Sequence, residues 1–163
     1  MSDKIKEQNV SALEQPQLRV LNQFIKDLSF ENIASQKGLS AESTKPDINI
    51  NVNLEAKKRA ADDQYDVVIK INILSKAKET GDIFFNLEMD YAGIFEIKKI
   101  PDEQLHPFLL IECPRIMFPY LRRIIADITR DGGYPSLNLD QIDFLAMYQS
   151  EIEKRSAKSS EIN

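Results

Sequence analysis

The chain has 163 residues and a formal net charge of -5, a size that suits one domain with its own hydrophobic core. The negative charge argues against nucleic acid as the main partner, because nucleic-acid binding depends on a basic surface. The single cysteine excludes an intramolecular disulfide, which is typical of the cytoplasm. The charged start, "MSDKIKEQ", is no secretory signal, and no apolar run reaches the roughly 18 residues that span a bilayer. We expect a cytoplasmic protein that does not insert into membranes.

Polar composition marks both ends of the chain. Residues 1–15 mix charged and amide side chains with scattered apolar ones, and residues 151–163 are polar and lack aromatics. Such segments bury too little apolar surface to fold alone. We expect flexible ends around one domain over residues 16–150.

Alternation of apolar and polar residues predicts strands. The clearest case is "DININVNLEA" (47–56), where every second residue is apolar. The segments "YDVVIKINILSKA" (65–77) and "IFFNLEMDY" (83–91) repeat this pattern. The segment "LRVLNQFIKDLSFE" (18–31) is less regular, and we assign one phase to its apolar residues Leu18, Val20, Phe24, Leu28 and Phe30.

Short turns join these predicted strands. "ETGD" (79–82) has a glycine where a hairpin turn needs positive φ. Strands that are apolar on one side and follow one another closely predict an antiparallel sheet with one solvent-exposed face.

After the predicted strands, the apolar residues of the chain recur at helical spacing. In "MFPYLRRIIADITR" (117–130) the apolar residues recur at helical intervals, and Gly132 and Gly133 follow. Pro119 predicts that this helix begins nearby or is kinked there. A last helix is expected near "LDQIDFLAMYQ", with Asp140 or Asp143 as its N-cap. The prediction is an α+β fold, a four-stranded antiparallel sheet with C-terminal helices packed on one face.

The only histidine, His106, lies seven residues before the only cysteine, Cys113. A catalytic thiol needs a paired base or an electropositive setting, and Cys113 stands between Glu112 and Pro114. One cysteine and one histidine do not complete a zinc site. We therefore interpret Cys113 as a buried apolar residue and expect no catalytic residue, no metal and no cofactor.

Apolar residues are in excess in "PFLLIECPRIMFPYL" (107–121). One helix buries one stripe, so the remaining apolar side chains need a second subunit or form a groove. The sequence leaves two interpretations open: a core with an oligomer interface, or the same with a groove that accepts apolar segments of a partner.

Several separated motifs resemble the SecB family of protein-export chaperones. They are "CPRIMFPYLRRIIADITRDGGYPSLNLDQIDFLAMY" (113–148), "KDLSFE" (26–31) and "GIFEI" (93–97), and the likeness runs from about Gln17 to Gln149. The resemblance implies a homotetramer, a dimer of dimers, without ATPase or other catalytic activity. It implies a holdase that keeps unfolded secretory precursors translocation-competent and delivers them to the SecA motor.

The resemblance also suggests site residues. Family members present an acidic patch to SecA, and Asp27, Glu31 and Glu88 stand at matching places, with Glu31 expected just beyond the end of its strand. Asn86 stands where relatives often have Leu, so an apolar part of that contact is expected to be weaker. Thr44 stands where some relatives carry Trp, so an aromatic side chain of that loop is not expected to line the client groove in this chain.

Two further groups of residues are candidates. Phe118 and Tyr120 are expected to line the client groove. The oligomer interface is expected to include Phe85, Leu87, Met89, Tyr91, Leu121, Ile124 and Ile128. Alternative functions are a SecB-like chaperone that controls a toxin–antitoxin pair, or a small-molecule-binding or thiol-dependent enzyme.

Overall fold

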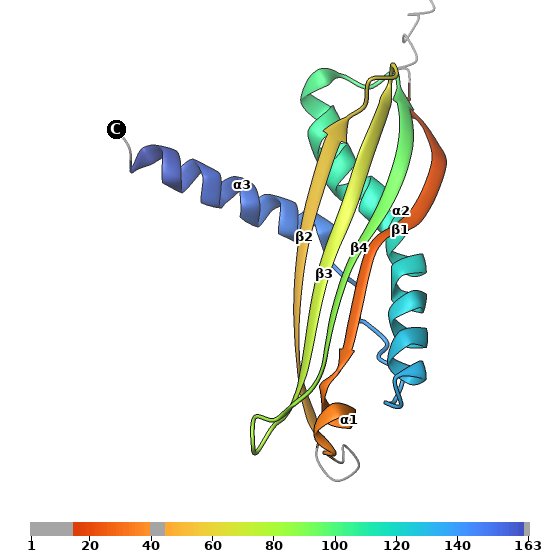
Figure 1. The fold of residues 1–163 in the computed structure, drawn as a ribbon. Helices are drawn as coiled ribbons and strands as arrows, with labels where there is room; N and C mark the ends of the chain where they lie inside the picture. The colour runs from red at the N-terminus through yellow and green to blue at the C-terminus, as the bar shows by residue number, and fades with distance from the viewer. Residues whose placement is uncertain (1–14, 40–44, 162–163) are drawn as a thin grey trace, which may run out of the picture.

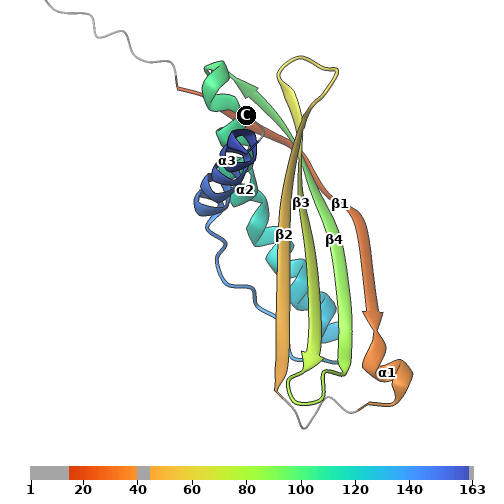
Figure 2. The same ribbon diagram turned by 90° about the vertical axis from the view of Figure 1, so that its left-hand side faces the viewer.

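The computed structural model describes residues 15–39 and 45–161 and contains one sheet. Its strands are β1 (Gln17–Asn32), β2 (Pro46–Lys58), β3 (Gln64–Ala77) and β4 (Ile83–Lys98), and its helices are α1 (Ile33–Lys37), α2 (Asp102–Asp131) and α3 (Phe144–Ser160). The strands are antiparallel in the order β1-β4-β3-β2, and both long helices lie on one side of them (Figures 1 and 2). This confirms the predicted fold class. Most of the expected N-terminal segment, and Thr44, lie outside the described residues.

Two faces of the sheet differ in burial. We call the face that α2 covers the inner face and the opposite one the outer face. Alternate residues of β3 and β4 are buried on the inner face, as the apolar period predicts: Tyr65, Val67, Ile69, Ile71, Ile73, Phe85, Leu87, Met89 and Tyr91. The hairpin turn between these strands is confirmed, with Gly81 at a φ of 76°.

Strand β1 is less regular than its apolar residues predict. Its pairing with β4 shifts register between Val20 and Asn22 and again between Ile25 and Asp27. Because a bulge turns the following side chains to the other face, Ile25 pairs with the inner-face residue Tyr91, and Phe24 pairs with Ala92 on the outer face. The single phase assigned to Leu18, Val20, Phe24, Leu28 and Phe30 was therefore wrong at Phe24.

Helix α2 begins earlier than predicted. It starts at Asp102 and contains Pro107, Pro114 and Pro119. Of the two alternatives predicted at Pro119, a helix start is therefore wrong, because the helix continues through this proline. Figure 1 shows that its two halves run in different directions. Proline weakens a helix interior, but the apolar side chains of this segment gain more by packing on the sheet, so the helix persists with a bend.

The C-terminal end of α2 is fastened to the sheet. Gly132 ends the helix, and a Cβ there would lie 2.6 Å from the ring of Phe30. The side-chain amide of Asn32 donates to the Gly132 carbonyl over 2.8 Å, and the Tyr134 hydroxyl lies 2.6 Å from Asn32 Oδ1 and 3.0 Å from the carbonyl oxygen of Phe84. The buried Thr129 hydroxyl accepts from the backbone N–H of Leu137. These bonds fix the segment that leads into α3.

Helix α3 is attached mainly at its first turn. Asp143 is its N-cap, as predicted, and accepts from the Ala146 N–H over 3.0 Å. Phe144 is its one buried residue, and the rest of the helix extends past β2 (Figure 1). Residues 151–160, expected to belong to a flexible tail, are the exposed second half of this helix. No helix in the described part of the chain is long and apolar enough to cross a membrane.

Burial predicts which substitutions destabilise the chain. Leu87 has no exposed surface, so Leu87→Ala should lower the free energy of unfolding by about 2–5 kcal/mol. Leu145 on α3 is 43% exposed, so Leu145→Ala should cost about 1 kcal/mol or less. Urea denaturation at one protein concentration measures both, and equal costs would contradict the central position of Leu87.

Candidate functional site

Four residues predicted from the sequence come together on the outer face. Asp27 pairs with Asp90, Ser29 with Glu88 and Glu31 with Asn86 across β1 and β4. Cross-strand partners share a face, so Asp27, Glu31, Asn86 and Glu88 form one surface, which we call the outer patch. Glu31 lies inside β1, not beyond its end as expected, because the strand continues to Asn32.

The outer patch keeps most of its negative charge. The side-chain amide of Asn72 donates to Glu88 over 3.0 Å, and that of Asn86 lies 3.5 Å from the same oxygen. These neutral donors orient the Glu88 carboxylate without cancelling its charge. Among the described residues, no cation forms an ion pair with Asp27, Glu31 or Glu88.

Lys70 is a cation on the outer face, and it pairs with two carboxylates beside the outer patch. Lys70 lies 3.1 Å from Glu55 and 4.0 Å from Asp90. Its hydrogen bond to Glu55 raises the pKa of Lys70, and the charges of Glu55 and Asp90 raise it further. Lys70 is therefore held as a cation between two carboxylates and leaves the outer patch negative.

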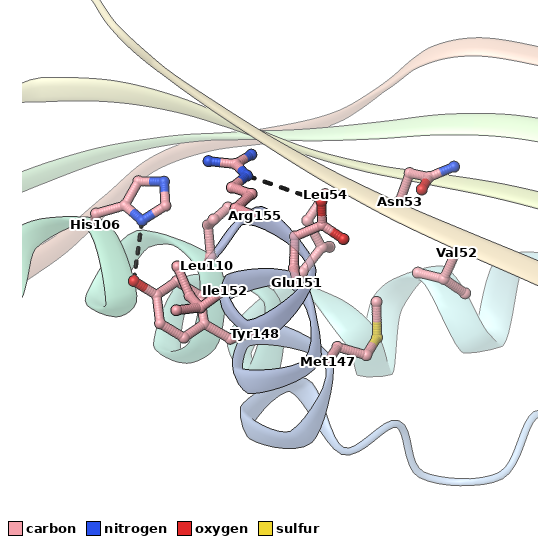
Figure 3. A pocket seen from close by; sticks show the side chains of 10 residues that line it. All are labelled: Val52, Asn53, Leu54, His106, Leu110, Met147, Tyr148, Glu151, Ile152 and Arg155. Atoms are coloured by element: carbon pink, nitrogen blue, oxygen red, sulfur yellow. Dashed lines mark hydrogen bonds and ion pairs between the residues drawn. The ribbon is translucent and has the colours of Figure 1, made fainter. Parts of the chain in front are cut away.

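A second candidate site is a pocket on the helix side of the sheet, between β2, α2 and α3. Its volume is about 160 Å³, and we call it the α3 pocket (Figure 3). Its lining residues are Val52, Asn53 and Leu54 from β2, His106 and Leu110 from α2, and Met147, Tyr148, Glu151, Ile152 and Arg155 from α3.

Contacts between two helices shape the α3 pocket. His106 Nδ1 lies 3.1 Å from the Tyr148 hydroxyl, and the two rings are 5.6 Å apart between centroids. Arg155 lies 3.8 Å from Glu151, so these two charges compensate each other (Figure 3). Sequence reasoning missed this pocket because it assigned residues 151–163 to a flexible tail. The available signal was Tyr148 and Ile152, four residues apart and thus on one helix face.

The two residues proposed for the client groove differ in the structure. Phe118 is 2% exposed and packs edge-on against Phe144, with ring centroids 6.0 Å apart. Tyr120 is 51% exposed. Tyr120 is therefore accessible on the surface. Phe118 is buried within the chain, where it packs against the first residue of α3.

The residues proposed for the oligomer interface are mostly covered as well. Phe85, Leu87, Met89, Tyr91 and Leu121 are buried within the single chain, while Ile124 and Ile128 are half-buried. The first five have no apolar surface to spare, contrary to the prediction, because the sheet and α2 already bury them against each other. Exposed apolar side chains are concentrated on β1 instead: Val20, Leu21, Phe24, Ile25 and Leu28.

Cys113 and His106 do not form a catalytic pair. Cys113 is fully buried, and burial, with a smaller contribution from Glu112, raises the pKa of its thiol to about 12. His106 contacts Tyr148 instead. No cluster of three or more metal-ligating residues occurs in the described part of the chain. Within the described residues, the thiol and the imidazole are thus engaged separately, Cys113 in the core and His106 at the α3 pocket.

Comparison with known proteins decides the family. The sequence model of the preprotein translocase subunit SecB matches residues 11–155. The chain belongs to the SecB family. Its SecB relatives include proteins named "Protein-export protein SecB" from Dinoroseobacter shibae, 61% identical over 87% of this chain and 82% of the relative, and from Ruegeria pomeroyi, 58% identical over 93% of both.

A solved structure supports the SecB fold. The SecB-like chaperone of Mycobacterium tuberculosis, in complex with a ChAD peptide from an antitoxin, matches with a TM-score of 0.62. The match covers 77% of this chain and 90% of that one, at 12% identity. At such low identity the likeness concerns the fold alone.

The pKa of Cys113 predicts slow thiol chemistry in the folded protein. At about pH 8 iodoacetamide should label the native chain far more slowly than the urea-unfolded chain, because the thiolate is the nucleophile. The folded-state pKa lies above the ordinary value of 9.0, so this group contributes stability below pH 9.0 and the contribution is lost as pH rises toward 12. Cys113→Ala should therefore reduce the fall in unfolding free energy over that range. Equal labelling rates in both states would contradict the burial of the thiol.

Proposed function

We propose that this chain is an ATP-independent holdase of protein export, which binds unfolded secretory precursors in the cytoplasm and keeps them competent for translocation. The observation that carries the proposal is the SecB match over residues 11–155, together with relatives named for protein export at 58% and 61% identity. The toxin–antitoxin alternative is the weaker interpretation, since the antitoxin peptide belongs to a structure only 12% identical to this chain.

The proposed mechanism is reversible burial of apolar surface. Unfolded chains expose apolar segments, and covering them contributes roughly 25 cal/mol per Å². Apolar side chains from β2, α2 and α3 line the α3 pocket. Tyr120, also on α2, is an exposed aromatic side chain outside this pocket. The proposal contains no catalytic step, so it requires neither a cofactor nor an active thiol.

We infer that the outer patch is the surface that docks on SecA. Its three carboxylates lie on adjacent strands and lack cationic partners among the described residues, so they suit a basic segment of a partner. Asn86 supplies an amide where relatives often have Leu, so the contact is expected to depend mainly on charge.

We infer further that the active form is a homotetramer, a dimer of dimers. Strand β1 exposes apolar side chains on both of its faces and lies at an edge of the sheet. Packing of a second copy against β1 would cover this surface, with Ile124 and Ile128 of α2 as further candidates.

The holdase proposal is tested with an unfolded precursor. The purified protein should suppress aggregation of a urea-unfolded secretory precursor on dilution without ATP, and it should bind the unfolded form but not the folded one. Cys113→Ala should leave this binding nearly unchanged, because the thiol is buried and protonated. Equal affinity for the folded and unfolded precursor, measured by calorimetry, would contradict the holdase function.

The SecA contact is tested by charge reversal. Asp27→Lys and Glu88→Lys should abolish binding to SecA and leave client binding intact. Asp62→Lys, in the turn between β2 and β3, makes the same charge change away from the patch and should bind normally. Binding of the unchanged protein should weaken with added salt, since screening acts over about 8 Å at physiological ionic strength. Unchanged SecA affinity in both patch variants would show that this surface is only solvated.

The tetramer is tested by light scattering. The unchanged protein should scatter as a tetramer at micromolar concentration. Ile25→Lys places a charge on the exposed inner side of β1 and should dissociate the assembly, because an unpaired charge in a dry interface is costly. Leu145→Lys on α3 is the matched control and should remain tetrameric. A stable monomer for the unchanged protein would refute the assembly.

A further inference from the structure

Two outward residues of β3 lie next to the outer patch and differ in charge. Lys70 and Asn72 occupy successive outward positions of β3, because the residues that alternate with them are buried on the inner face. In the register of the sheet, Lys70 lies opposite Asp90 of β4, and Asn72 lies opposite Glu88. Strand β3 thus places a cation beside one carboxylate of β4 and a neutral amide beside the next.

Asp90 shares the position of the outer patch but not its free charge. It lies directly opposite Asp27 across β1 and β4, where two like charges repel each other. Lys70 Nζ lies 4.0 Å from Asp90 Oδ2 and 3.1 Å from Glu55 Oε1. A cation of a partner that approaches Asp90 therefore meets the positive charge of Lys70, which repels it.

Glu88 has the opposite environment. Its partner on β1 is Ser29, which is flanked on the outer face by Asp27 and Glu31, so Glu88 lies at the centre of the outer patch. Asn72 donates to Glu88 Oε1 over 3.0 Å, and Oε2 accepts no hydrogen bond from the described part of the chain. The amide orients the carboxylate and keeps its charge, while the second oxygen is left for a partner.

We propose that β3 determines which carboxylates of the outer face a basic partner binds: Lys70 closes Asp90 to the partner's cations, and Asn72 leaves Glu88 charged and accessible. The inference rests on the docking surface proposed for SecA and adds two specificity-determining residues outside the outer patch. It also implies that the affinity is lower than the carboxylates of this face allow, because Lys70 competes with the partner for Asp90.

Exchange of the two residues tests the selection at constant net charge. The double variant Lys70→Asn with Asn72→Lys moves one cation by two residues, about 7 Å along β3, from Asp90 to Glu88. It should bind SecA at least about fivefold more weakly in calorimetry, with a shallower dependence on salt, because the central carboxylate is now neutralised. Unchanged affinity in this variant would overturn the proposal.

Removal of the cation alone should have the opposite effect. Lys70→Asn frees Asp90 and should tighten SecA binding by about twofold to fivefold, with a steeper dependence on salt. The matched control is Lys57→Asn, which removes the same charge from the outer side of β2. The row of Lys57 crosses β4 at Ile94, about 13 Å along the strand from Asp90, so its effect should be smaller. Equal gains in the two variants, or no gain for Lys70→Asn, would overturn the proposal.

A purely structural role of Lys70 predicts a different result. Lys70 also offsets the repulsion between Asp27 and Asp90, so its loss should lower the free energy of unfolding. Loss of stability does not strengthen binding to a partner, so tighter SecA binding by Lys70→Asn separates the two roles. Light scattering and precursor binding should match those of the unchanged protein in all three variants. Should the exchange impair assembly, Lys70→Asn and its control decide the question.

Further outcomes separate this inference from the proposed function. If the unchanged protein did not bind SecA, the proposed docking surface would fail, and the role of β3 with it. If Asp27→Lys abolished SecA binding but the exchange of Lys70 and Asn72 did not weaken it, the docking surface would stand and selection by β3 would be wrong.

Discussion

Burial of the inner face of β3 and β4 beneath α2 is the interaction on which the rest of this structure depends. The central strands supply alternate apolar side chains, and α2 supplies Leu109, Met117, Leu121 and Ile125, all of which are buried. This packing outweighs the cost of three prolines inside one helix. It also commits one face of the sheet to the core and leaves the outer face open to solvent.

The two candidate surfaces follow from that division. On the outer face, the alternation that buries Leu87 and Met89 turns Asn86 and Glu88 outward, and pairing with β1 brings Asp27 and Glu31 beside them. On the inner side of the sheet, α3 is buried only at Phe144. A more exposed part of the helix forms the wall of the α3 pocket that lies opposite β2. One sheet thus carries a charged surface on its outer face and an apolar-lined pocket at the edge of its inner side.

The fastening of the α2 end explains how α3 is positioned. Gly132 allows the helix to end against Phe30, and Asn32, Tyr134 and Thr129 hold the following segment by hydrogen bonds. The direction in which α3 departs is therefore set by contacts with the far end of β1. The contact between His106 and Tyr148 links α2 to α3 beside the α3 pocket.

Sequence alone determined the strands, the one-sided burial of the central ones and the hairpin turn, because these depend on local alternation and turn chemistry. It narrowed the cap of α3 to Asp140 or Asp143, and the structure has Asp143. The family motifs also identified the residues of the outer patch. Only the tertiary structure decided the rest. The bulges that move Phe24 to the outer face arise from pairing with β4, and the early start of α2 depends on burial that no local rule for proline contains. Likewise, the coverage of Leu87 and Phe118, and the pocket shared by β2, α2 and α3, come from contacts between segments far apart in the chain.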